Sequence, residues 1–120
     1  MRERIRDKSR LEHIVQAIES IESFTAGFDH DRFVEDPIVS AAVSYNIVVI
    51  GEAVYKLTKE FKEEHDATPW QQIEGMRHVM VHGYYVASKD TVWKVVEADL
   101  PVLRQQVQQY LDELNSEAEL

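Results

Sequence analysis

The chain has 120 residues, enough for one domain with a modest hydrophobic core. With 44% hydrophobic and 29% charged residues, its composition excludes a disordered chain, and the absence of cysteine excludes disulfides and thiolate metal sites. A net charge of −9 is unfavourable for binding nucleic acid over a broad surface, so a phosphate-binding site here would depend on a few local cations.

Nothing in the sequence predicts a membrane span or an exported protein. There is no run of eighteen apolar residues, and the N-terminal segment 1–8 mixes charges where a signal peptide would be apolar. Together with the lack of cysteine, these features indicate a cytoplasmic protein.

The first helix is predicted from about Asp7 to Thr25. Apolar residues recur there at helical spacing, with glutamates on the opposite side. Gly27 gives the stop signal that a glycine just beyond a helix end often provides. The connector that follows, 28–36, has room for a single helical turn at 31–34.

The second predicted helix, from Pro37 to about Glu64, is the most apolar, with Asp36 as its N-cap and Pro37 at its first position. Its first half, 38–50, is apolar on nearly every side, which predicts burial on more than one face. In so small a protein part of that surface is suited to a partner, so we expect a homodimer.

A third helix is predicted from the N-cap Thr68 to His82, where Gly83 ends it. A fourth begins at Asp90 and is kinked or restarted by Pro101. The sequence contains neither strand alternation nor internal repeats. We therefore predict an all-α protein, an up-and-down bundle of four to five helices in a single domain over residues 1–120.

The end of the third predicted helix carries the least ordinary residues. Arg77 is followed after four residues by His82 and after one more by Tyr84, a pattern that chance would produce roughly 0.01 times in a chain of this composition. A guanidinium can bind a phosphate through two donors, and an imidazole can accept or release a proton near neutral pH. In principle these two groups cleave RNA without a metal, because the base removes the ribose 2′-OH proton and the cation neutralises the phosphorane.

This pattern resembles the motif of the HEPN superfamily, in particular the HepT-like ribonuclease toxins. The likeness covers most of the chain and includes the segments 17–19, 24–27, 46–53, 69–77 and 92–101. It implies a homodimer in which the motifs of two subunits converge on one cleft. There Arg77 would stabilise the phosphorane and His82 would act as general base or acid, giving a 2′,3′-cyclic phosphate and a 5′-OH without a cofactor.

The same resemblance implies a regulatory role for Tyr84. In HepT-like toxins the tyrosine of the motif is the acceptor that a cognate MntA-type nucleotidyltransferase antitoxin modifies with AMP. An adenylate beside the cleft would place bulk and negative charge where the substrate phosphate binds. The implied partners are therefore an RNA substrate, the MntA-type antitoxin and a second copy of the chain.

Other interpretations of the motif remain open. Arg77 and His82 lie about 140° apart around an ideal helix, so they could be no more than a structural ion pair and a helix cap. His78 departs from the family pattern, in which asparagine or aspartate more commonly follows the arginine, although it could replace that contact as a hydrogen-bond donor. It also places Glu74, His78 and His82 at four-residue steps, a stripe that could hold a divalent transition metal and would indicate a metal hydrolase.

Two further polar residues, Asn46 and Glu52, match the family on the second predicted helix. They could support the cleft or fix the register of the helix. Trp70 and Trp93 are expected to be core or interface anchors.

The leading hypothesis is a metal-independent endoribonuclease toxin of a HepT/MntA-type toxin–antitoxin system. The alternative, which the acidic charge and His78 favour, is a non-catalytic helical adaptor that binds and regulates a nucleotidyltransferase.

Overall fold

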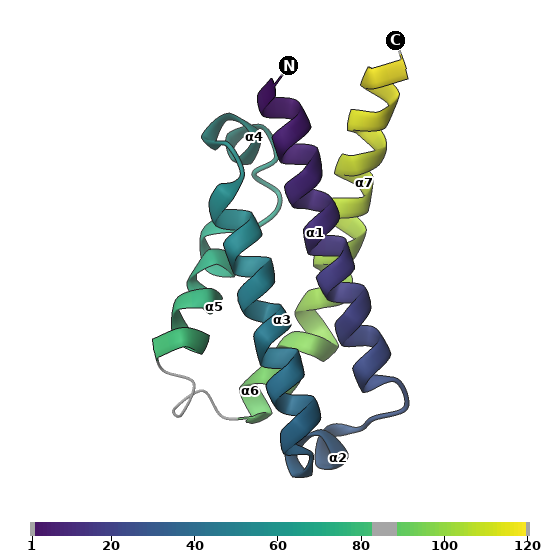
Figure 1. Cartoon of the computed structure of the whole chain (residues 1–120), viewed down its shortest axis with the longest axis vertical. Coiled ribbons are helices and arrows are strands. Elements are labelled where there is room, and N and C mark those ends of the chain that lie inside the picture. The colour runs from purple at the N-terminus through teal and green to yellow at the C-terminus, as the bar shows by residue number, and fades with distance from the viewer. Residues whose placement is uncertain (1, 83–88, 120) are drawn as a thin grey trace.

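The computed structural model describes residues 2–82 and 89–119; the side chains at 81, 82 and 119 lie outside that description. The described residues form helices and no strand, which confirms the predicted all-α class (Figure 1). The elements are α1 (Arg2–Thr25), α2 (His30–Glu35), α3 (Pro37–Lys56), α4 (Lys59–Glu64), α5 (Trp70–His82), α6 (Lys89–Lys94), a π-helical turn η1 (Val95–Asp99) and α7 (Leu100–Glu119).

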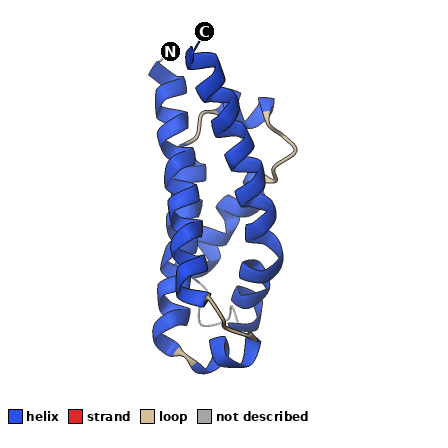
Figure 2. Ribbon diagram, turned by 90° about the vertical axis from the view of Figure 1, so that its right-hand side faces the viewer, coloured by secondary structure: helices blue, strands red, loops and turns tan. Residues whose placement is uncertain are grey.

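The long helices run alternately up and down, and both chain ends lie at the same end of the bundle (Figures 1 and 2). α3 packs between α1 and α5, while α1 also contacts α7. The bundle measures 49 × 28 × 20 Å. This arrangement agrees with the predicted up-and-down bundle and makes α3 the central helix, but the described residues form more helices than the four to five predicted, because α2, α4 and α6 are short separate helices.

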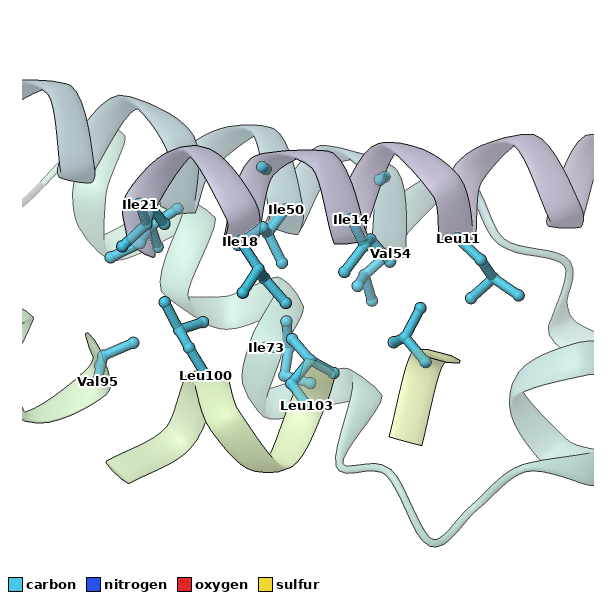
Figure 3. Packing of buried hydrophobic residues seen from close by; sticks show 14 of the residues in the cluster. Leu11, Ile14, Ile18, Ile21, Ile50, Val54, Ile73, Val95, Leu100 and Leu103 are labelled. Atoms are coloured by element: carbon cyan, nitrogen blue, oxygen red, sulfur yellow. The ribbon is translucent and has the colours of Figure 1, made fainter. Parts of the chain in front are cut away.

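The core follows the helical periodicity of the first helix (Figure 3). Leu11, Ile14, Ile18 and Ile21 of α1 are fully buried and form one row. Residues from the other long helices pack against this row: Ile50 and Val54 of α3, Ile73 of α5, and Leu100 and Leu103 of α7. Burial of this apolar surface is the main stabilising contribution to the bundle.

Among the described helices, α3 alone is long and apolar enough to cross a membrane by length and composition. The core helix of a globular bundle passes the same test, and α3 packs against both α1 and α5. It begins as predicted, because one carboxylate oxygen of Asp36 accepts hydrogen bonds from the backbone N–H groups of Ile38 and Val39, at 3.1 and 2.9 Å.

The prediction of one helix over 37–64 was wrong, because α3 ends at Lys56 and Thr58 caps a separate helix, α4. Asp7 of α1 causes the break: its carboxylate, 3% exposed, accepts hydrogen bonds from the Thr58 backbone N–H at 2.9 Å and the Thr58 hydroxyl at 2.7 Å. In a continuous helix that N–H would instead bond to Val54. α1 itself begins at Arg2, earlier than predicted.

Two features of the C-terminal half also differ from the prediction. The buried Thr68 hydroxyl donates to Gln106 at 2.8 Å and shares a 2.6 Å hydrogen bond with the Tyr110 hydroxyl, so it joins the segment before α5 to α7 instead of capping α5. Pro101 does not restart the helix. The helical structure runs without interruption from α6 through the π-helical turn into α7, and the turn is closed by the bond from the Leu100 N–H to the Val95 carbonyl.

His30 joins α2 to α6. Its imidazole is hydrogen-bonded to Asp31, at 3.0 Å, and to Asp90 at the start of α6. These two carboxylates raise the pKa of His30 above its usual 6.5, Asp31 contributing most. The pairing therefore stabilises the folded state below that usual pKa and is lost as pH rises through the raised value.

Replacing Asp7 by alanine should lower the free energy of unfolding by about 1–3 kcal/mol, because the half-buried Thr58 N–H and hydroxyl would lose their acceptor. Denaturant unfolding followed by circular dichroism measures this loss. Glu12→Ala, which removes an exposed carboxylate of the same helix, should change stability by less than about 0.5 kcal/mol. Equal losses in the two variants would contradict the role given to Asp7.

Candidate active site

The position of Arg77 is set by a close contact between α3 and α5. A Cβ atom added to the buried Gly51 of α3 would lie 2.4 Å from the Cβ of Arg77 and 3.3 Å from its Cα. Only a glycine permits this approach without displacing α5. The backbone of Arg77 is therefore packed directly against α3.

The side chain of Arg77 lies along the outer surface of α3 and is 28% exposed. Its Nη1 is 3.1 Å from Oε1 of Glu52, and its guanidinium carbon lies 4.9 Å above the ring centroid of Tyr55. The ion pair and the ring restrict the guanidinium to one orientation at the surface. A guanidinium has five N–H donors, of which the contact with Glu52 uses one.

The other predicted support, Asn46, is occupied within its own helix. Its amide nitrogen donates to the carbonyl of Ala42 at 2.9 Å, the local bond that lets a half-buried asparagine sit in an apolar helix. The structure thus places Glu52 against Arg77 and gives Asn46 a bond within α3. His78 is exposed on α5.

His82 is the last residue of α5, while its side chain and the whole of Tyr84 lie outside the described residues. Their geometry relative to Arg77 therefore stays a prediction. Within the described part, no three His, Asp or Glu side chains are placed to hold a metal ion. The stripe of Glu74, His78 and His82 includes an undescribed side chain, so the metal alternative also stays a prediction.

The two tryptophans are structural, as predicted. Trp70 is buried and donates its indole N–H to the His65 carbonyl at 2.9 Å. Trp93 packs on Phe33 with the ring centroids 5.2 Å apart. Neither is an exposed aromatic surface for a ligand.

The Arg77 site lies on an exposed stripe of α3. Ile38, Tyr45 and Glu52 follow one another at seven-residue steps, which places them on one side of the helix. Ile38 is 80% exposed and Tyr45 68%, and Tyr55 continues the stripe with 56%. The stripe is thus apolar in its first half and ends beside a charged group.

Sequence reasoning missed two residues of this site, Gly51 and Tyr55. Gly51 had a recognisable signal, since a glycine inside a helical pattern indicates either a cost in stability or a close packing contact. Tyr55 had none, because only the packing of α5 on α3 brings its ring under Arg77.

Comparison with known proteins identifies relatives along most of the chain. The family model described as "Ribonuclease HepT-like" matches residues 14–110. A protein of Caldanaerobacter subterraneus subsp. tengcongensis named "Putative RNase" is 37% identical over 101 residues, which are 84% of this chain and 90% of that protein. A "Probable ribonuclease HepT" of Thermococcus cleftensis is 35% identical over 97 residues, 81% of this chain and 88% of that protein.

A longer relative from Methanocaldococcus jannaschii carries a compound name, "Gamma-glutamylcyclotransferase and putative RNase". It is 32% identical over 108 residues, which are 90% of this chain but 49% of that protein. No solved structure matches the chain.

Gly51→Ala should displace α5 and lower the free energy of unfolding by about 1–3 kcal/mol, because its methyl group overlaps the Arg77 side chain. Gly75→Ala on α5 is the matched control: nothing lies within 4 Å of the added methyl group, so the change should be neutral or stabilise by up to about 1 kcal/mol. Thermal unfolding of both variants measures the difference. A stable Gly51→Ala protein would contradict the close contact.

Proposed function

The chain belongs to the HepT-like ribonuclease family, and we propose that it is a metal-independent endoribonuclease that acts as a homodimer. The observation that carries this proposal is the guanidinium of Arg77, held at the surface by Glu52 and Tyr55 with donors to spare. A fixed cation of this kind stabilises charge that develops on a phosphate during cleavage.

In the proposed reaction His82 removes the proton from a ribose 2′-OH, and the 2′ oxygen attacks the adjacent phosphate. Arg77 neutralises the charge of the phosphorane. The bond to the 5′ oxygen then breaks, a protonated histidine returns a proton to that oxygen, and the products carry a 2′,3′-cyclic phosphate and a 5′-OH. The second proton transfer can use His82 of the other subunit.

Glu52 supports this role as a positioning residue. It accepts one hydrogen bond from Nη1 of Arg77, and this bond restrains the guanidinium. A structural ion pair would explain the same contact, so the contact alone does not assign a function. The incomplete burial of Arg77 and the family membership favour catalysis, because a purely structural pair gains nothing from donors left exposed.

The apolar first half of the α3 stripe, with Ile38 and Tyr45, supports the homodimer. Ile38 and Tyr45 expose apolar surface in line with the Arg77 site, so a second copy that covers them would bring its own Arg77 to the same cleft. Such a cleft supplies two histidines, one for each proton transfer.

We further propose that the protein is the toxin of a HepT/MntA-type toxin–antitoxin system in the cytoplasm. Tyr84, two residues beyond His82, is the position that the resemblance to HepT-like toxins gives to the acceptor of an AMP group. An MntA-type nucleotidyltransferase antitoxin would add it, and the charge and bulk of the adenylate would exclude the substrate phosphate.

A helical adaptor that regulates a nucleotidyltransferase is the second candidate. The net charge of −9 and His78 in place of the usual asparagine or aspartate favour it. Growth inhibition on expression separates the two: a toxin loses it when Arg77 or His82 is replaced by alanine, whereas an adaptor does not inhibit growth through these residues.

Wild-type protein should cleave labelled RNA in the presence of EDTA and leave a 2′,3′-cyclic phosphate. His82→Ala and Arg77→Ala should each slow cleavage by at least about 100-fold, because they remove the proton-transfer group and the phosphorane cation. His13→Ala, which removes an exposed histidine of α1, is the control and should cleave normally. Cleavage that EDTA abolishes would instead favour a metal site at Glu74, His78 and His82.

Co-expression with the partner nucleotidyltransferase should add the mass of one adenylate and abolish cleavage. Tyr84→Phe should remain unmodified and active, since it lacks the acceptor oxygen, whereas Tyr85→Phe should be modified like the wild type. Intact-mass spectrometry followed by the cleavage assay measures both effects. Modification of Tyr84→Phe would reject Tyr84 as the acceptor.

A further inference from the structure

Tyr55 is the one aromatic side chain of the described residues that combines wide exposure with contact to the Arg77 guanidinium. It lies in the last turn of α3 and is 56% exposed. The guanidinium carbon of Arg77 lies 4.9 Å above its ring, so one face of the ring is covered by the cation while the residue remains open to solvent. A tyrosine ring exposed to solvent lacks the stabilisation that burial normally gives an aromatic side chain.

We propose that Tyr55 is a stacking platform for a base of the substrate and that the substrate is unpaired RNA; this inference rests on the proposed ribonuclease function. Single-stranded RNA is recognised by stacking its bases on aromatic rings and by binding its phosphates with cations. With a phosphate bound to Arg77, the base of an adjoining nucleotide can reach the open part of the Tyr55 ring.

The local charge agrees with this placement. On a chain with a net charge of −9, RNA can approach only where cations gather. Arg77 lies over the ring, and the exposed Lys56 follows Tyr55 directly at the end of α3. Both cations can attract the phosphates of a strand that lies at this end of α3.

Stacking on Tyr55 would make the site select unpaired over paired bases without selecting one kind of base. Every base has a π-face, so a ring platform tolerates any base but excludes a base that is paired within a duplex. Tyr55 therefore contributes to the affinity for single strands and loops and not to the choice of one base.

The test measures binding of a short 2′-O-methyl RNA, which cannot be cleaved because its 2′ oxygen is blocked. Wild type, Tyr55→Phe and Tyr55→Leu are each titrated with this strand, with its duplex, and with a strand of abasic sugars of the same length. Tyr55→Leu should bind the strand roughly tenfold more weakly than wild type, within the range for loss of one stacked base. Tyr55→Phe, which keeps the ring, should bind like wild type, and the abasic strand should bind equally to all three proteins.

Several results would overturn the platform. Equal binding of the strand by wild type and Tyr55→Leu would show that the ring carries no base. An equal loss on the abasic strand would show that Tyr55 acts only by orienting Arg77, and a loss in Tyr55→Phe would assign the effect to the hydroxyl. If wild type cleaves RNA but shows one of these results, only the platform fails, whereas a wild type that neither binds nor cleaves RNA rejects the proposed function as well.

Discussion

The contact between Gly51 and Arg77 is the constraint on which the site depends. A helix-interior glycine costs stability, and here the loss is balanced by the close packing of α5 on the central helix. That packing fixes the backbone of Arg77, after which Glu52 and Tyr55 fix its guanidinium. The orientation of one charged group thus results from the packing of the whole bundle.

An acidic protein whose candidate site contains the cation of Arg77 differs from a protein with a broad basic surface for RNA. The net charge of −9 repels RNA over most of the molecule, so binding at the site must come from short-range contacts. Such contacts can come from Arg77, which lies over the ring of Tyr55, from the ring itself, and from Lys56, which follows Tyr55 in the chain.

Local signals in the sequence predicted the helices well. The Asp36 cap and the apolar row of α1 depend on neighbours a few residues away, and both appear in the structure. The break after α3 could not be predicted, because Asp7 acts on Thr58 across 51 residues. The family resemblance named Glu52 as possible support for the cleft, but no local signal predicted that it pairs with Arg77, since the two residues are 25 positions apart and the packing of α5 on α3 brings them together.

The most direct test of the account is whether the Arg77 guanidinium binds RNA phosphate. The measurement is the ¹⁵N NMR signal of each arginine side chain during titration with uncleavable 2′-O-methyl RNA. The account predicts that the Arg77 signal shifts and saturates, while the signal of Arg104, which is paired with Glu19 and Glu22 of α1, stays in place. An unchanged Arg77 signal on bound protein, or an equal response from Arg104, would contradict it.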